Sequence, residues 1–242
     1  MKIRLFQKGF NFSQDGPGNR MVYHLQGCNL VCPWCSNPEG LCCSGGTEYT
    51  VEQLVADAVS CRMMFFEGGG VTLTGGEVTM QFAAIREFLT RLKEENIHTC
   101  IETNGIHPKL PELFPLIDYL IMDCKHYDPE AHRRITGVEN SMTLRNLELA
   151  IAAGKHPAVR IPLIGGFNAG EADAAGFSRL FQQIHLPGNG TLELLTYHEY
   201  GKEKYKKLGL PYTMTEQARI TPDMLRRFAA ILHENGIDTI RS

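Results

Sequence analysis

The sequence predicts an α/β fold whose parallel strands form a partial (β/α)6 barrel resembling a TIM barrel. After residue 50, short β-rich runs alternate with amphipathic helical stretches, and repeated right-handed crossovers of this kind build a parallel sheet that curls. No linker, low-complexity segment or shift in composition interrupts the 242 residues, so we expect a single domain over residues 1–242. Periodicity does not distinguish a curled sheet from an open, doubly wound one, which stays the alternative.

The expected strands and helices alternate along the chain. Strands are expected where apolar and β-branched residues gather, at Met21–Gln26, Val71–Thr74, His98–Thr103, Tyr119–Asp123, Ala158–Leu163 and Thr191–Tyr197. Thr50 and Gln53 form a capping box that opens a helix. Apolar residues then recur at helical spacing, at Val51, Leu54, Val55, Ala58 and Val59. Further helices are expected near Met80–Glu95, Ser141–Ala153, Glu171–Ile184 and Pro222–Asn235.

Polar residues and glycines stand where these strands end. Ligands of parallel α/β folds bind at the carboxyl ends of the strands, so these segments predict one large site. In strand order they are Gly27-Cys28, Gly75-Gly76-Glu77, Glu102-Thr103-Asn104-Gly105, Asp123-Cys124-Lys125, Arg160 within the fifth strand, and Tyr197-His198-Glu199-Tyr200-Gly201.

Composition and charge exclude some partners and indicate a compartment. The formal charge is -3 and the longest basic stretch is the short Lys202–Lys207, which argues against nucleic acid. The amino terminus has no signal-peptide core and no apolar run approaches the roughly 20 residues that span a bilayer, so we expect a cytoplasmic protein without a membrane partner. Its eight cysteines are then reduced. Cys61, Cys100 and Cys124 are expected in the core.

Three cysteines, Cys28, Cys32 and Cys35, form a C-x3-C-x2-C motif on one loop. Three thiolates on a four-iron cube leave one iron open to a small molecule, whereas electron-transfer clusters normally have four cysteines. A structural zinc site with Cys42 or Cys43 as fourth ligand is one alternative, although zinc spacings usually come as two separated pairs. A redox disulfide between Cys32 and Cys35 is the other.

With an aromatic residue before its last cysteine, this motif resembles that of the radical S-adenosylmethionine (SAM) superfamily. The likeness to its glycyl-radical-enzyme activating enzymes, notably the pyruvate formate-lyase activases, covers the chain from about Phe12 to the last helix. The segments that carry it are the cysteine motif, Ser13–Gly18, Gly75-Gly76-Glu77, Asp123-x-Lys125 and Tyr197–Gly201. Only Ser36–Tyr49 separates the motif from the Thr50 cap, so the chain resembles the short form, without the ferredoxin-like insert and its further clusters. The residues Cys-Pro-Trp-Cys-Ser-Asn-Pro-Glu look more like the longer activases.

The resemblance implies one 4Fe-4S cluster on Cys28, Cys32 and Cys35, and SAM as the second cofactor. Glycines 75 and 76 would let backbone approach SAM, and Glu77 would hold its amine. Asp123, Lys125 and Arg160 would orient the ribose and carboxylate. Further SAM contacts are implied for Asn37, His198 and Trp34, although Trp34 could instead cover the cluster. Glu102 and Thr103 match the position of an Asp-Thr pair that lines a monovalent cation site in the family. This sequence has Glu102 where the family has Asp.

The implied reaction is reductive cleavage of SAM to methionine and a 5′-deoxyadenosyl radical, which takes hydrogen from a backbone glycine of a partner enzyme. No side chain need act as acid, base or nucleophile. Asp15 and Gly16 would meet the glycine loop of the partner, a glycyl radical enzyme, and a flavodoxin-like or ferredoxin-like protein would donate the electron. The identity of the partner stays open. Two other functions remain: a radical SAM enzyme for a small molecule and a non-catalytic metal-binding module.

Overall fold

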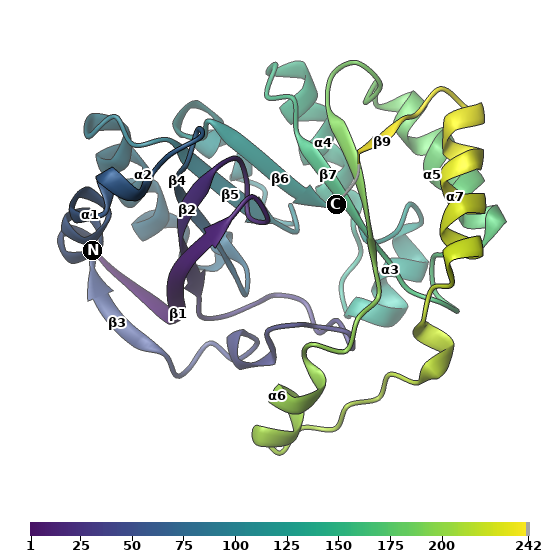
Figure 1. Ribbon diagram of the computed structural model, residues 1–242, viewed down its shortest axis with the longest axis horizontal. Coiled ribbons are helices and arrows are strands. Elements are labelled where there is room, and N and C mark those ends of the chain that lie inside the picture. The colour runs from purple at the N-terminus through teal and green to yellow at the C-terminus, as the bar shows by residue number, and fades with distance from the viewer. Residues whose placement is uncertain (241–242) are drawn as a thin grey trace. The chain divides into compact units, whose positions relative to one another are not determined.

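The structure is a computed structural model that describes residues 1–240. The chain groups into two compact units, which we describe separately (Figure 1). The first unit holds Met1–Asn29, Asn37–Thr103 and Lys109–Ile121, and the second holds Leu30–Ser36, Asn104–Pro108 and the chain from Met122 onward.

In the first unit, six strands form a sheet in the order β3-β1-β2-β4-β5-β6, the last of which continues into the second unit. Their bounds are β1 (Lys2–Phe12), β2 (Asn19–Leu25), β3 (Thr47–Thr50), β4 (Gly70–Gly75), β5 (Thr99–Thr103) and β6 (Tyr119–Asp123). Two α-helices and four 3₁₀ helices connect them: η1 (Pro38–Gly40), α1 (Val51–Ser60), η2 (Arg62–Met64), η3 (Val78–Gln81), α2 (Phe82–Glu94) and η4 (Leu110–Leu116).

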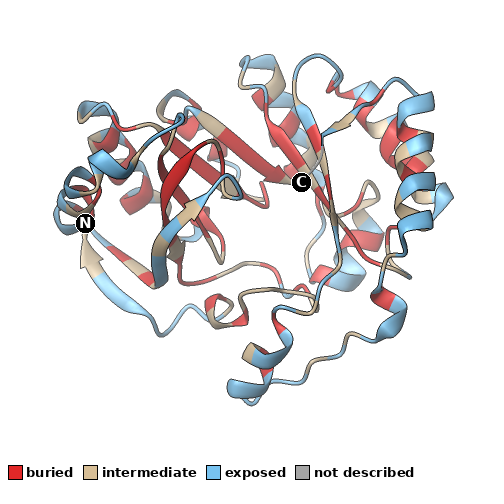
Figure 2. Ribbon diagram, viewed as in Figure 1, coloured by how far each residue is buried: buried red, intermediate tan, exposed pale blue. Residues whose placement is uncertain are grey.

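Strand register sets which residues share an end of this sheet. β2 and β4 are parallel, with Arg20 beside Gly70 at one end and Leu25 beside Gly75 at the other. β4 and β5 are also parallel. These strands are buried almost throughout (Figure 2), which explains their enrichment in apolar and β-branched residues. The rings of Tyr23 and Phe88 pack edge to face at a centroid distance of 5.7 Å, so α2 packs on β2.

β1 and β3 are antiparallel additions to this parallel core. β1 pairs with β2 on one side and with β3 on the other. β3 is only four residues long, and its Glu48 forms ion pairs with Lys2 at 2.6 Å and Arg4 at 3.2 Å. Neither strand was expected from the sequence, because β1 is largely exposed and contains too many polar residues for a buried strand.

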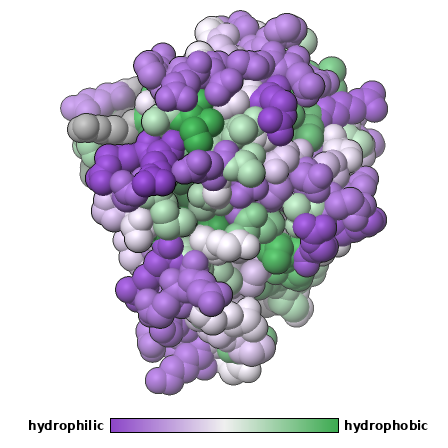
Figure 3. Space-filling model, turned by 90° about the vertical axis from the view of Figure 1, so that its right-hand side faces the viewer, coloured by the Kyte–Doolittle hydropathy of each residue, from purple (hydrophilic) through white to green (hydrophobic). Residues whose placement is uncertain are grey.

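The second unit contains the end of β6 and three further strands in the order β7-β8-β9, with β8 parallel to both neighbours. The strands are β7 (Ala158–Leu163), β8 (Thr191–Thr196) and β9 (Thr239–Ile240). The helices are α3 (Pro129–Thr136), α4 (Ser141–Ala152), α5 (Glu171–Gln183), α6 (Lys202–Lys207), η5 (Glu216–Ala218) and α7 (Pro222–Glu234). Phe177 of α5 packs against Phe181 and against Phe228 of α7, which joins the two helices. The face of this unit turned to the viewer in Figure 3 is mostly hydrophilic, with small apolar islands.

The predicted α/β fold with mostly parallel strands is confirmed, and the sheet is open. All six expected strands are present, two of them at the expected bounds, and so are the five expected helices, including the Thr50 capping box. The additional elements are β1, β3, β9, α3, α6 and the 3₁₀ helices. The single domain over residues 1–242 remains a prediction. Within residues 1–240, no helix is long and apolar enough to cross a membrane.

Candidate active site

In the first unit, Gly75 ends β4 and Gly76 follows it, in close contact with the segment that leads to Cys28. The Gly76 N–H donates to the Leu25 carbonyl at 2.9 Å, and a Cβ at Gly76 would lie 2.1 Å from the Gly27 carbonyl oxygen. Gly75 has φ +113°, a conformation that L side chains rarely adopt. Only glycine therefore lets the two backbone segments approach so closely.

Glu77 is buried, with 1% of its surface exposed. Its Oε1 accepts hydrogen bonds from the Thr79 N–H at 3.0 Å, the Thr79 hydroxyl at 2.7 Å and the Thr103 hydroxyl at 2.7 Å. The structure thus brings together two residues that the sequence assigned to one site from different strands. It also makes Glu77 the N-cap of η3. The neighbouring Glu102 accepts a hydrogen bond from the Thr74 hydroxyl at 2.8 Å.

A buried glutamine fixes the loop beside Cys28. Gln26 donates through Nε2 to the carbonyls of Glu39 and Cys42, at 2.8 and 2.6 Å, and the Cys28 N–H donates to the Leu41 carbonyl at 3.3 Å. Asn37 begins this loop as the N-cap of η1. The segment after the cysteine motif therefore runs back along Gln26–Cys28.

Asp15 and Gly16 precede β2 and fold back onto the middle of β4 and β5. The Asp15 carbonyl accepts a hydrogen bond from the Thr72 hydroxyl at 2.6 Å, and a Cβ at Gly16 would lie 3.2 Å from Cys100 Sγ. Within the first unit, these two residues therefore contact the middle of the two strands, whereas Gly75 is the last residue of β4.

In the second unit, Cys32 and Cys35 lie on a tight turn, in which the Cys35 N–H donates to the Cys32 carbonyl at 3.1 Å. Tyr205 of α6 donates its hydroxyl to the same carbonyl at 3.3 Å. A Cβ on Gly201 would lie 2.2 Å from the Cys35 carbonyl oxygen. α6 and the residue before it are thus packed directly on the cysteine turn.

Tyr205 is a site residue that sequence reasoning missed. It is 6% exposed, and burial, together with the nearby thiols of Cys35 and Cys32, raises its pKa to about 12. Tyr205 therefore stays neutral near pH 7 and donates rather than accepts a hydrogen bond. Its partner is 173 positions away in the chain, so no local signal could have identified it.

Asp123, Lys125 and Arg160 lie side by side in the second unit. Lys125 Nζ is 2.7 Å from Asp123 Oδ2, with the lysine side chain 11% exposed. The Cys124 N–H donates to the Arg160 carbonyl at 2.8 Å, which places β7 next to this pair. Arg160 also pairs with Glu193 of β8 at 2.6 Å, a partner the sequence analysis did not identify.

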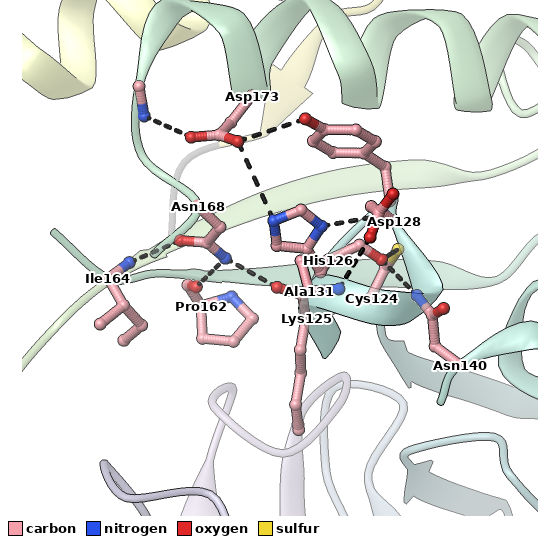
Figure 4. Close-up of polar contacts among 12 residues, drawn as sticks. Cys124, Lys125, His126, Asp128, Ala131, Asn140, Pro162, Ile164, Asn168 and Asp173 are labelled. Carbon is pink, nitrogen blue, oxygen red and sulfur yellow. Dashed lines mark hydrogen bonds and ion pairs between the residues drawn. The ribbon is translucent and has the colours of Figure 1, made fainter. Parts of the chain in front are cut away.

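Asn168 holds the backbone of this region (Figure 4). It is fully buried, its Nδ2 donates to the carbonyls of Lys125 and Pro162, both at 2.8 Å, and its Oδ1 accepts from the Ile164 N–H at 2.8 Å. One side chain thereby joins the segment after β6 to the end of β7. In Figure 4 the Lys125 side chain extends away from this amide.

His126 forms a second set of contacts there. Its Nδ1 accepts from the Asp128 N–H at 2.9 Å, its Nε2 lies 3.9 Å from Asp173 Oδ1, and its carbonyl accepts from the Asn140 side chain (Figure 4). Burial lowers the pKa of His126, and Asp173 opposes that effect. These contacts fix the backbone directly after Lys125.

Trp34 and His198 contact aromatic rings of their own unit. Trp34 lies 5.2 Å from Phe167 between ring centroids, and Phe167 in turn lies 5.0 Å from His126. His198 stacks on Tyr200 at 4.0 Å and is exposed. Neither contact assigns a role toward SAM.

The remaining cysteines divide into buried and accessible ones. Cys100 and Cys124 are buried as expected, and burial raises the pKa of the Cys124 thiol to about 12. The expectation of a buried Cys61 is wrong: it is the C-cap of α1 and is partly exposed. Cys42 and Cys43 are exposed. Among residues 1–240, no three His, Cys, Asp or Glu side chains are gathered closely enough for a single metal ion.

Comparison with known proteins defines the class. Residues 22–177 match the radical SAM superfamily, a span that begins within β2 and ends within α5. A radical SAM methyltransferase from Sphaerobacter thermophilus has a similar fold, with a TM-score of 0.68 at 18% identity, over 100% of this chain and 76% of that one. The chain belongs to the radical SAM superfamily.

The more similar relatives are activating enzymes. Pyruvate formate-lyase 1-activating enzyme of Escherichia coli K12 is 33% identical over 228 residues, which cover 92% of each chain. Indoleacetate decarboxylase activating enzyme of Tractidigestivibacter scatoligenes is 25% identical over 309 aligned residues, covering 99% of this chain and 97% of that one. The second alignment is longer than this chain's 242 residues, so that relative contains insertions. The first needs few gaps.

Members of this superfamily use a 4Fe-4S cluster and SAM, and the residues present suit both. Two of the three thiols lie on a turn whose carbonyls are fixed by Tyr205 and Gly201. Each thiolate of a cube binds a different iron, so the three sulfurs need not surround one ion. At the end of β4, Gly75 and Gly76 let the backbone of Leu25 and Gly27 pack directly against them, next to a buried carboxylate, Glu77.

Proposed function

We propose that the chain is a glycyl-radical-enzyme activating enzyme. The observation that carries the proposal is its 33% identity with the E. coli activating enzyme over 92% of both chains. When bound, the cluster and SAM supply the radical chemistry: reductive cleavage of SAM to methionine and a 5′-deoxyadenosyl radical, which takes hydrogen from the α-carbon of a backbone glycine. The residues of the chain bind, orient and shield these groups.

Cys28, Cys32 and Cys35 would hold the cluster, and their surroundings support this role. The Cys32 carbonyl accepts a hydrogen bond from Tyr205, and Gly201 packs closely against the Cys35 carbonyl, so α6 supports the turn that carries the two thiols. Preorganised ligands lose less conformational entropy when a metal group binds. Tyr205 thus acts as a positioning residue for the cysteine turn.

The proposed SAM contacts follow the family resemblance. Glu77 would pair with the SAM amine, while Thr103 fixes the Glu77 carboxylate. Lys125 and Arg160 would supply positive charge for the SAM carboxylate, with Asp123 on the ribose hydroxyls. The remaining proposed SAM contacts are Trp34, Asn37, Gly75, Gly76 and His198. Glu102 and Thr103 are proposed for a monovalent cation.

The protein partner is proposed at the level of its class. Relatives named for two different target enzymes match this chain, so the target is a glycyl radical enzyme of unassigned type. Asp15 and Gly16 would contact its glycine loop, and an electron-transfer protein would supply the electron. We place the reaction in a single domain working in the cytoplasm, where thiols stay reduced.

A radical SAM enzyme for a small molecule is the second candidate. It is favoured by the hydrogen bond between the Asp15 carbonyl and the Thr72 hydroxyl, because packing on β4 explains the Asp15 segment without a protein partner. An anaerobic assay separates the two: the reconstituted protein is reduced with dithionite and supplied with SAM, and 5′-deoxyadenosine is measured against a Cys32→Ala control. Activation predicts a glycyl radical signal by electron paramagnetic resonance when a glycyl radical enzyme is added. Lack of any iron-sulfur cluster would overturn both candidates.

A further inference from the structure

α6 is a basic helix in a chain that is acidic overall. Its six residues include four lysines and one glutamate, whereas the whole chain has a formal charge of -3. Lys202, Lys206 and Lys207 are exposed. The helix therefore presents a concentrated positive charge to solvent.

The opposite side of this helix is fixed to the cysteine turn. Tyr205, the buried residue of α6, donates its hydroxyl to the Cys32 carbonyl at 3.3 Å. Gly201 is the N-cap of α6, and a Cβ on it would lie 2.2 Å from the Cys35 carbonyl oxygen. Two contacts thus attach the helix to the turn that carries two of the three motif cysteines.

The basic residues of α6 flank the residue that contacts the cysteine turn. Lys204 and Lys206 are the direct neighbours of Tyr205 in the chain, and consecutive Cα atoms lie about 3.8 Å apart. One short helix of this unit thus carries exposed lysines toward solvent and Tyr205 toward the cysteine turn. A protein that covers α6 would bring its own surface next to Cys32 and Cys35.

We propose that α6 is the docking surface for an acidic electron-transfer protein that reduces the cluster. The inference rests on the proposed function, because it presumes a cluster on these cysteines. In this step the donor's reduced centre loses one electron and the oxidised cluster gains it, without bond formation or proton transfer. Complementary charge chiefly accelerates encounter and fixes orientation, which is what repeated one-electron delivery requires.

The test uses the reconstituted full chain and a chemically reduced acidic flavodoxin as the probe. Lys206→Glu with Lys207→Glu reverses the exposed charge of α6. Arg226→Glu with Arg227→Glu on α7 makes the same change of net charge at exposed positions of the same unit. Anaerobic stopped-flow absorbance measures the rate of cluster reduction at ionic strengths of about 0.01 M and about 1 M, where charges act over about 30 Å and about 3 Å.

At low salt, we expect the α6 variant to be reduced on the order of tenfold more slowly than the wild type, and the α7 variant to stay near the wild-type rate. At high salt the three rates should converge. Lys206→Gln with Lys207→Gln should give an intermediate rate, which excludes misfolding as the cause. Equal low-salt rates for the wild type and the α6 variant, or equal slowing in both charge-reversed variants, would overturn the docking proposal.

A dithionite arm separates this inference from the proposed function. Dithionite is small and needs no docking surface, so 5′-deoxyadenosine formation at high salt should be the same in all variants. If dithionite gives none even in the wild type with its cluster intact and a glycyl radical enzyme present, the proposed function fails. If dithionite-driven activation of that enzyme is slowed only in the α6 variant, α6 contacts the protein substrate instead, and the donor proposal is wrong.

Discussion

At the scale of single residues, the backbone of the proposed site residues is held by hydrogen bonds from side chains far away in the sequence. Asn168 lies 43 positions from Lys125, whose carbonyl it binds, and Tyr205 lies 173 positions from Cys32. Neither belongs to a motif. These supporting residues lend themselves to direct tests, because each has a small and defined set of hydrogen bonds.

Asn168→Asp should destabilise the protein. The substitution replaces a donor to two carbonyls with an oxygen, so the buried group loses both hydrogen bonds and faces like partial charges. We expect the free energy of unfolding to fall by about 3 kcal/mol, measured as the denaturant midpoint at constant m-value. Asn189→Asp is the control, since Asn189 is exposed and donates to one carbonyl. Equal midpoints for the two variants would contradict the role assigned to Asn168.

Glu77→Gln should weaken SAM binding while the fold persists. Glutamine keeps an oxygen that can accept from Thr79 and Thr103, but removes the charge proposed to pair with the SAM amine. The lost charge-assisted hydrogen bond is worth about 2 kcal/mol, or about 30-fold in Kd. Isothermal titration of the reconstituted protein with SAM measures it. Unchanged affinity would remove Glu77 from the proposed SAM site.

The residues of the site were predictable to the extent that their chemistry is visible in the sequence. Cysteines at metal spacing and paired glycines after a strand can be recognised without a structure. The structure explains why Gly76 is a glycine: a Cβ at this position would lie 2.1 Å from the Gly27 carbonyl oxygen. The partners of Glu77 and Arg160 could not be predicted, because Thr103 and Glu193 are brought to them by strand register.

At the scale of elements, the buried parallel strands were predictable and the antiparallel additions were not. β2 and β4 are buried almost throughout because both faces are covered, and their apolar residues form the runs that the sequence shows. β1 alternates buried and exposed residues only over its first half and then becomes exposed. The hydrophobic pattern of a sequence identifies a strand when the strand is buried, because burial requires apolar side chains. A strand that pairs with the edge of a sheet and stays exposed is much less constrained in its sequence.

The junction of β4 with the Gly27 segment predicts a contrast between two glycines. Gly76→Ala would place a methyl group 2.1 Å from the Gly27 oxygen, so backbone must move. We expect a loss of about 3 kcal/mol in stability and of most cluster incorporation. Gly9→Ala in β1 meets no atom within 4 Å and should be neutral or slightly stabilising. Thermal denaturation and iron content compare the two; similar behaviour would contradict the close-packing argument.

The C-terminus of α3 predicts a pH-dependent stability. His132 is 2% exposed, its Nδ1 lies 2.5 Å from the Val138 carbonyl, and burial lowers its pKa to about 4. An unfolded histidine titrates near pH 6.5, so between these values the unfolded state binds more protons and stability falls as pH falls. The loss on going from pH 7 to pH 4 should be about 3 kcal/mol.

His132→Asn should remove this part of the pH dependence. The measurement is the free energy of unfolding of both proteins between pH 4 and pH 7, because their difference cancels the carboxylates that titrate in the same range. A constant difference across that range would show that His132 does not stay neutral in the folded state. The effect also bears on the site, since the Thr136 carbonyl at the end of α3 accepts from the Val31 N–H, next to Cys32, at 3.0 Å.

At the scale of the whole molecule, the chain matches the compact pyruvate formate-lyase activating enzyme of E. coli with few gaps. Its cysteines outside the motif are two exposed neighbours, Cys42 and Cys43, and three others dispersed over separate elements. A second cluster with four thiolate ligands has no evident ligand set in this arrangement.

Reconstituted protein should therefore contain about four irons per chain. Cys42→Ala with Cys43→Ala should leave that content unchanged, whereas Cys32→Ala should reduce it strongly. Iron and acid-labile sulfide analysis under anaerobic conditions gives the answer. About eight irons per chain, or a loss of iron in the Cys42/Cys43 variant, would mean that these thiols bind metal after all.

The short strand β3 has a consequence for how other proteins can bind. It closes one side of the first unit's sheet with four residues, and Lys2 and Arg4 hold its Glu48 in ion pairs. A long, flat, apolar border invites another chain to join by backbone hydrogen bonding, and a brief charged one does not. This edge therefore disfavours a partner loop that would extend the sheet as an added strand. It also leaves nascent or crowded copies of the chain less prone to join one another into fibrils.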